Sequence, residues 1–184
     1  MTFNIISTFL IAVALAMDAF SVSMTKGFTQ KNLKNSQILY YGLFFGGFQA
    51  LMPILGYFCG NVIAAIVTSL APIIGFILLL AIGLNMIRES LTDDEGKITD
   101  TFSFKEVTLL AIATSIDAFA VGITIALIKD PILISSAIIG IVAFIFSIIG
   151  IFLGKKLGNY VGDKFQIVGG IILIIIGIKI LLGF

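Results

Sequence analysis

Two acidic residues lie inside apolar stretches that resemble each other. Asp18 lies in residues 16–23, which read AMDAFSVS, and Asp117 lies in residues 115–122, which read SIDAFAVG. An ionised carboxylate in hydrocarbon is costly, so an acidic residue within a membrane usually faces a partner, an ion or a water-filled cavity. The repeated Asp-Ala-Phe core predicts that both carboxylates contribute to one shared site.

A pair of carboxylates in a membrane suits one kind of chemistry above others. Carboxylate, hydroxyl and carbonyl oxygens bind hard or borderline divalent cations, such as Mg²⁺, Ca²⁺ and Mn²⁺, better than soft ones. Two facing carboxylates also repel each other, which favours retention of a proton while no metal is bound. A metal that enters would displace this proton, which is a physical basis for cation/proton exchange. The alternative is a structural polar pair that shares a proton.

Three further polar residues are candidates for the same metal site. Ser21 follows Asp18 by three positions and Thr114 precedes Asp117 by three, so each hydroxyl shares a helical face with an acid. Such hydroxyls also bond back to their own helix, and the two roles are about equally expected. Gln49 lies within an apolar run and needs a hydrogen-bond partner, which either the metal site or a neighbouring helix can supply.

The composition excludes most other site chemistry. The chain has no histidine, and its one cysteine, Cys59, has no second thiol to pair with. The commonest general base and the Cys/His zinc sites are therefore absent. There is no Walker-type glycine loop for ATP, and no feature typical of nucleic-acid binding. We expect a protein that is not an enzyme and that holds no permanent cofactor.

The overall composition is typical of a membrane protein. Of 184 residues, 59% are hydrophobic and 11% are charged, whereas charged residues make up about a quarter of a soluble domain. The mean hydropathy is +1.19. Six apolar runs are each long enough to cross about 30 Å of hydrocarbon as a helix. The expected spans are 4–25, 37–58, 62–87, 105–128, 132–153 and 166–183. The sequence therefore predicts an all-α integral membrane protein with six transmembrane helices.

The six expected spans form two sets of three. Residues 1–87 make the first set, residues 88–104 a charged cytoplasmic linker, and residues 105–184 the second set. Four positions in or just after the second span recur 94 residues later, in or just after the fifth: Gly46, Gly56, Phe58 and Gly60 correspond to Gly140, Gly150, Phe152 and Gly154. The two sets start on opposite sides of the membrane, so the pattern predicts inverted repeats. Transporters of this type bind their substrate near the bilayer midplane.

The basic residues predict the orientation in the membrane. Nine of the eleven lie on the side of the first, third and fifth loops: Lys26, Lys31, Lys34, Arg88, Lys97, Lys105, Lys155, Lys156 and Lys164. Because cytoplasmic loops carry the excess of Lys and Arg, this side is expected in the cytoplasm and both termini outside. Lys129 and Lys179 lie on the other side. Lys179 is expected to extend to the outer interface.

Several of these segments resemble a known family. Residues 16–23 and 113–122, together with residues 45–53, which read FGGFQALMP, resemble the bacterial manganese efflux pump (MntP) family. The resemblance covers essentially the whole chain. It implies a secondary transporter that exports Mn²⁺ across the cytoplasmic (inner) membrane, with Mn²⁺ as transported substrate and with Asp18 and Asp117 as transport residues.

Two other functions remain compatible with the sequence. One is a membrane assembly or scaffold protein that transports nothing. The other is an exporter of another substrate, such as a different divalent cation, since related cation exporters share the architecture. In the transport interpretations the partners are a divalent metal ion and the lipid bilayer, with no nucleic acid. An oligomer is compatible with the sequence.

Overall fold

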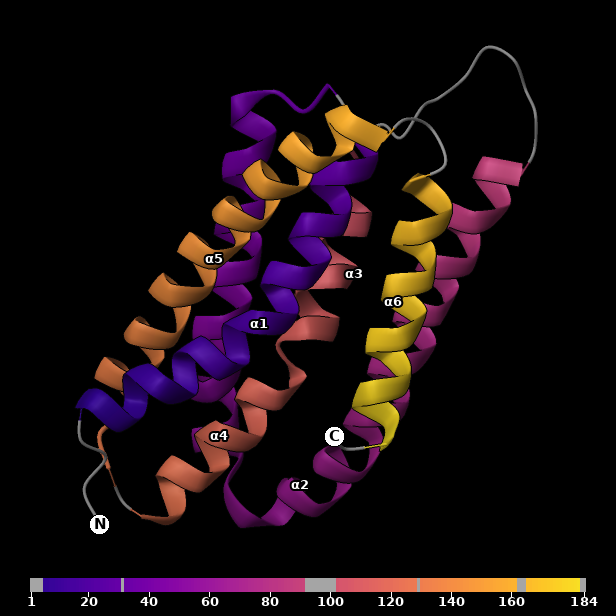
Figure 1. Ribbon diagram of the computed structural model, residues 1–184. Coiled ribbons are helices and arrows are strands. Elements are labelled where there is room, and N and C mark those ends of the chain that lie inside the picture. Colours follow the sequence, from indigo (N-terminus) through magenta and orange to yellow (C-terminus); the bar gives the residue numbers. More distant parts are fainter. Residues whose placement is uncertain (1–4, 31, 92–101, 129, 162–164, 183–184) are drawn as a thin grey trace.

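The computed structural model describes residues 5–30, 32–91, 102–128, 130–161 and 165–182 (Figure 1). In these ranges the backbone forms six helices and no strand. The helices are α1 (Ile5–Thr29), α2 (Asn35–Leu91), α3 (Phe104–Thr114), α4 (Ile116–Leu127), α5 (Ile132–Val161) and α6 (Phe165–Leu182). The predicted all-α class is confirmed.

The surface of the helical bundle suits a lipid environment. Within the described residues, three helical segments are long and apolar enough to cross a membrane, namely Ile5–Thr29, Asn35–Cys59 and Ile132–Leu157, and α3 with α4 adds a fourth if this bent pair is one span. Large apolar side chains such as Phe9 and Leu133 are exposed along the outside. A surface this apolar is expected to face hydrocarbon rather than water. The chain is a multi-pass helical membrane protein.

The first helix is longer than predicted. The sequence placed Lys26 in a loop after a span that ends at residue 25, whereas α1 continues to Thr29. Lys26 is 1% exposed, and its Nζ lies 2.5 Å from Oε1 of Glu106 at the start of α3. The loop prediction was wrong because a carboxylate on another helix balances the buried ammonium, so the charge does not end the helix.

The second helix contains two of the predicted spans. The backbone is helical from Asn35 to Leu91, so the predicted spans 37–58 and 62–87 are not separated by a break in the helix. Figure 1 shows the path of α2 turning back at its lowest point, after which it rises beside α6. Leu79 in this later part packs near Gly177 of α6. The expected second and third spans thus occupy successive parts of α2.

Part of the predicted organisation lies outside the described residues. Residues 92–101 make up most of the linker expected at 88–104, and residues 1–4 and 183–184 form the two ends of the chain. The division into sets at 1–87 and 105–184, and the placement of both termini on the outer side of the membrane, stay predictions.

Glycines bring helix backbones into direct contact. Gly46 of α2 and Gly140 of α5 face each other, and a Cβ atom built on either would lie 2.8 Å from the other's carbonyl oxygen. Small residues permit such close approach, which supplies much of the packing energy between membrane helices. Two of the glycines that recur in the predicted repeat therefore pack against each other.

Two further glycines hold the Asp-Ala-Phe segments. A Cβ atom on Gly56 of α2 would overlap the carbonyl oxygen of Phe119 in α4. A Cβ atom on Gly150 of α5 would lie 2.6 Å from the carbonyl oxygen of Phe20 in α1. Each Phe comes two residues after an Asp. The backbone next to each acidic residue is therefore fixed against a glycine of another helix.

Replacement of Gly122 tests this packing. Gly122 of α4 lies against the backbone of Pro53 in α2, and an added Cβ atom would overlap the Pro53 carbonyl oxygen. Because backbone cannot rotate away, the helices must separate, and we expect Gly122→Ala to lower the free energy of unfolding by about 1–3 kcal/mol. Gly47→Ala is the control, since nothing lies within 4 Å of a Cβ atom there. Denaturant unfolding in detergent measures both, and equal effects would contradict the packing.

Candidate functional site

The fourth predicted span is broken next to its acidic residue. The sequence predicted one helix over residues 105–128, but α3 ends at Thr114 and α4 begins at Ile116, with a bend of 42° between them. Ser115 at the junction has φ −109° and ψ 3°. Broken helices inside membranes occur where the irregular backbone is buried in protein or lines a cavity. The prediction of one continuous helix was wrong.

Side-chain hydroxyls donate hydrogen bonds to a backbone carbonyl at this break. The backbone N–H of Ser115 donates to the carbonyl of Ile112, at 3.1 Å, so it no longer serves the carbonyl of Ala111 in the usual helical pattern. The Ser115 hydroxyl donates to that Ala111 carbonyl instead, at 2.6 Å. The Thr114 hydroxyl lies 3.3 Å from the same carbonyl oxygen. The Ser115 and Thr114 hydroxyls therefore supply donors to the Ala111 carbonyl where the regular helical pattern ends.

Asp117 lies in the first turn of α4. Its Oδ1 accepts a hydrogen bond from the backbone N–H of Ala118, at 2.9 Å. A carboxylate is stabilised at a helix N-terminus because the free N–H groups there carry partial positive charge. The side chain of Asp117 keeps part of its surface exposed, and its hydrogen bond with Ala118 is partly buried. The break therefore creates a stabilised carboxylate that remains accessible to an ion.

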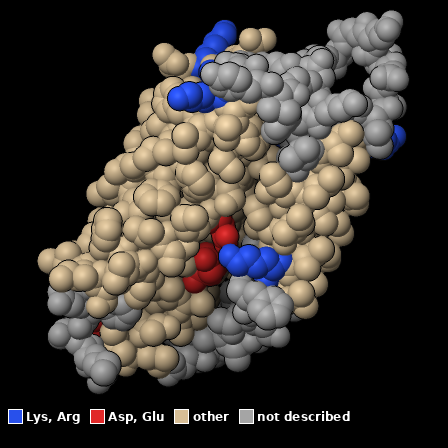
Figure 2. All heavy atoms as spheres, viewed as in Figure 1, with Lys and Arg blue, Asp and Glu red and all other residues tan. Residues whose placement is uncertain are grey.

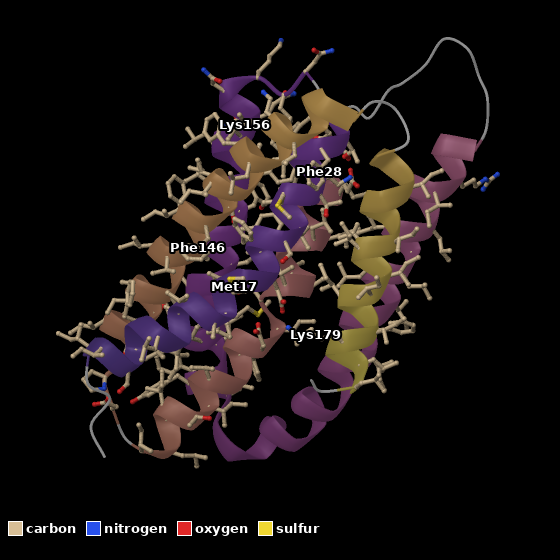
Figure 3. All side chains as sticks on the ribbon, viewed as in Figure 1. Met17, Phe28, Phe146, Lys156 and Lys179 are labelled. Atoms are coloured by element: carbon tan, nitrogen blue, oxygen red, sulfur yellow. The ribbon has the colours of Figure 1, made fainter. Side chains whose placement is uncertain are left out.

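Asp18 lies on α1, close enough to Asp117 for their charges to interact. The side chain of Asp18 is partly buried, and its Oδ1 lies 4.0 Å from Nζ of Lys179 in α6. The charge of Lys179 also acts on Asp117. Figure 2 shows acidic and basic atoms next to each other on this face, and Figure 3 shows Lys179 extending from α6 toward α1 and α4. Three helices therefore bring two acids and one base together.

Lys179 is the site residue that the sequence interpretation missed. It was expected to extend to the outer interface, whereas its ammonium lies beside Asp18. A lysine inside the apolar sequence of α6 has the same signature as the two aspartates, namely a charge where hydrocarbon is expected. Applying the same reasoning to Lys179 as to Asp18 and Asp117 would have identified it as a site residue.

Gln49 forms a helix-to-helix hydrogen bond. Its side chain is fully buried on α2, and Nε2 donates to the carbonyl of Leu15 in α1, at 3.1 Å. Leu15 is three residues before Asp18. Oε1 of Gln49 is buried and has no hydrogen-bond partner among the described residues. The Gln49 amide thus joins α2 by a hydrogen bond to α1, the helix that carries Asp18. Its side-chain oxygen can still accept a hydrogen bond or coordinate an ion.

The two candidate hydroxyl groups bond to their own helices. The Ser21 hydroxyl donates to the Met17 carbonyl at 2.8 Å, and the Thr114 hydroxyl donates to the Leu110 carbonyl at 3.0 Å. These bonds are one of the two roles expected from the sequence. A hydroxyl that donates in this way keeps its oxygen lone pairs, so each could still accept from or coordinate another group.

The acidic pair does not form a closed cage for a metal ion. Among the residues that the structure describes, no three His, Cys, Asp or Glu side chains gather in a group. Two carboxylates supply part of the coordination of a divalent ion, and neutral oxygens or water must supply the rest. Such an incomplete set suits an ion that passes through better than one that is held permanently.

The comparisons with known proteins agree with this chemistry. The family model described as "Putative manganese efflux pump" matches residues 32–181. The chain belongs to this family. The resemblance expected from the sequence motifs is therefore confirmed, and no solved structure matches the chain.

Relatives that carry the name "Putative manganese efflux pump MntP" align over almost the full chain. A protein of Methanobrevibacter smithii is 71% identical over 181 residues, which cover 98% of each chain. A protein of Methanosphaera stadtmanae is 65% identical over 179 residues, covering 97% of this chain and 99% of its own. A protein of Campylobacter jejuni is 46% identical, with coverage of 96% and 95%. The members of the manganese efflux pump family therefore align with this chain along nearly their whole length.

Replacement of Ser115 tests the origin of the helix break. Ser115→Ala removes the hydroxyl that satisfies the Ala111 carbonyl, and we expect it to lower the free energy of unfolding by about 1 kcal/mol. Thr108→Ala is the control, because the Thr108 hydroxyl makes the same kind of bond, to Phe104, within a regular turn of α3. That change should stay within about 0.5 kcal/mol. Thermal unfolding in detergent compares them, and a larger loss for Thr108→Ala would refute the explanation.

Proposed function

We propose that this chain is a secondary transporter that exports Mn²⁺ from the cytoplasm through a site formed by Asp18 and Asp117. The observation that carries the proposal is the approach of these carboxylates from α1 and α4, beside a helix break, in a member of the manganese efflux pump family. The relatives' printed names give the metal and the direction of transport. Oxygen ligands are the type that Mn²⁺ accepts.

The proposed architecture is six spans in two inverted repeats, residues 1–87 and 105–184, joined by a cytoplasmic linker at 88–104. One support is the surface position of equivalent residues. Phe58 and Phe152 correspond under the predicted repeat, and both side chains are exposed. Equivalent positions in inverted repeats should face equivalent surroundings.

A second support comes from equivalent contacts. Gly56 packs against Phe119, and Gly150 packs against Phe20. Under the predicted repeat Gly56 corresponds to Gly150, and Phe20 corresponds to Phe119. The two contacts are therefore equivalent under the predicted repeat. In one of them the first repeat supplies the glycine and the second the Asp-Ala-Phe segment, and in the other these roles are exchanged. Two interlocked repeats of this kind provide the symmetric interface that alternating access requires.

The proposed metal site contains Asp18 and Asp117 as charged ligands. Gln49 Oε1, a buried acceptor that lacks a partner among the described residues, is the first candidate for a neutral ligand. The Ser21 and Thr114 oxygens are further candidates, since each hydroxyl uses its hydrogen on its own helix. Small movements of α1 against α4 would complete or open this set, as transport rather than storage requires.

The proposed location is the cytoplasmic membrane, with the basic end of the bundle inside the cell. Figure 3 shows Lys156 close to one end of the bundle and Lys179 well toward the other. Lys26 and Lys155 lie at the same end as Lys156, in the last turn of α1 and in the later part of α5. The excess of basic residues marks this end as cytoplasmic.

Neutral variants of the two aspartates test the metal site. We expect Asp18→Asn and Asp117→Asn each to weaken Mn²⁺ binding by about tenfold or more, because each removes one of two charged ligands. The shift in melting temperature with Mn²⁺ measures binding, since a ligand of the folded state stabilises it. Asp130→Asn, in the connection between α4 and α5, is the control.

The same titrations with Ca²⁺, Zn²⁺ and Cd²⁺ identify the preferred ion. Growth of a manganese-sensitive strain measures export, and we expect rescue by the wild type but by neither aspartate variant. Full rescue by both variants would refute the site and would favour the scaffold function. A larger stabilisation by another divalent ion would refute Mn²⁺ as the preferred substrate.

Proton movement tests the exchange mechanism. We expect Mn²⁺ uptake into proteoliposomes to drive protons out, because a metal that occupies the carboxylates displaces a proton from them. A pH-sensitive dye trapped inside should report a rise in luminal pH that depends on Mn²⁺. Vesicles that contain the double variant Asp18→Asn with Asp117→Asn should show no rise. Mn²⁺ uptake by the wild type at constant luminal pH, with the membrane potential clamped, would contradict proton exchange.

A further inference from the structure

The candidate site contains a positive charge of its own. Nζ of Lys179 lies 4.0 Å from Oδ1 of Asp18, and its charge reaches Asp117 as well. A divalent ion that binds between the carboxylates would have to share them with this ammonium. Since repulsion between two cations at such distances is strong in a medium of low dielectric constant, the ammonium and the metal compete.

The two ion pairs in the described residues differ in how firmly they are held. Lys26 is 1% exposed and lies 2.5 Å from Glu106, so this pair is a fixed contact between α1 and α3. Lys179 is 55% exposed, and its 4.0 Å separation from Asp18 is too long for a hydrogen bond. The lysine side chain is flexible, with a charged end that can rotate away. The Lys179 ammonium can therefore leave the carboxylates without unfolding the helix.

The backbone of Lys179 is fixed even though its side chain is not. Two residues earlier, Gly177 packs closely against α2, where an added Cβ atom would lie 3.3 Å from side-chain atoms of Leu79 and Phe76. The last turns of α6 are thus held on α2, while the lysine reaches across toward α1 and α4 (Figure 3). The ammonium therefore stays within one side-chain length of the site even when it moves away from the carboxylates.

We propose that Lys179 is a tethered counter-cation that balances one negative charge of the Asp18–Asp117 pair while no metal is bound, and that it thereby determines which ions bind. This inference rests on the proposed function of the pair as a metal site. A monovalent ion that displaces the ammonium replaces one positive charge with another, so the net charge of the site does not change. A divalent ion neutralises both carboxylates. The tethered lysine therefore excludes Na⁺ and K⁺ and lowers the affinity for Mn²⁺, which favours release.

A titration of melting temperature against Mn²⁺ tests this role. We expect Lys179→Gln to raise the apparent Mn²⁺ affinity by about tenfold, because the competing charge is gone. Lys179→Arg keeps the charge and should stay near the wild type. Lys105→Gln makes the same change in charge at the far end of α3 and should have no effect. Lys179→Met is a second neutral variant in case the glutamine variant is unstable.

The choice of salt tests ion exclusion directly. Each titration is repeated in sodium chloride and in choline chloride at equal ionic strength, so that screening is the same and only access of a small cation differs. The wild type should give equal Mn²⁺ affinities in the two salts. The neutral variants should bind Mn²⁺ several-fold more weakly in sodium chloride, because Na⁺ can then enter the carboxylate pair.

The outcomes separate this inference from the proposed function. If the wild type is stabilised by Mn²⁺ and Asp18→Asn is not, the metal site stands. Unchanged or weaker Mn²⁺ binding by the neutral Lys179 variants would then overturn the role of Lys179 alone. Equal affinities of those variants in the two salts would overturn ion exclusion. Absence of Mn²⁺ stabilisation in the wild type would overturn the metal site, and this inference with it.

Discussion

The electrostatic cost of charge in an apolar environment governs the irregular features of this protein. A charged group removed from water must find a partner, because the surrounding medium supplies none. Asp117 uses the N-terminus of α4, and a helix can begin there only because the chain breaks at Ser115. Asp18 lies beside the ammonium of Lys179, and Lys26 forms an ion pair with Glu106. The bend between α3 and α4, the extension of α1 through Lys26 and the position of the Lys179 side chain thus each place a charged group next to a partner.

Close backbone packing makes these solutions depend on one another. Phe20 and Phe119 each follow an aspartate by two residues and rest against Gly150 and Gly56. A displacement of α5 or α2 is therefore passed directly to the backbone beside a carboxylate, with no flexible side chain between. Interiors packed this closely move as units rather than deforming gradually. The geometry of the carboxylate pair is set by how the helices sit against each other.

The sequence predicted what depends on local pattern and missed what depends on distant partners. Hydropathy identified the apolar runs, and the 94-residue spacing identified Gly46 and Gly140 as equivalent positions, but their mutual contact is known only from the structure. The extension of α1 through Lys26 was missed because Glu106, its partner, belongs to another predicted set of spans. Lys179 was misjudged for the same reason. The break at Ser115 uses ordinary helix-compatible residues, so no composition change marks it.

The two ion pairs also differ in the energy needed to separate them, which bears on the proposed transport cycle. Breaking a buried pair costs about 3–5 kcal/mol, whereas Lys179 and Asp18 are too far apart for a hydrogen bond. Lys26–Glu106 joins α1 to α3 at the basic end, and Lys179–Asp18 joins α6 to α1. Movement of α6 from the carboxylates is therefore cheaper than separation of α1 from α3. In the proposed transport cycle, Lys26–Glu106 would therefore hold α1 and α3 together at the basic end while Lys179 leaves the carboxylates.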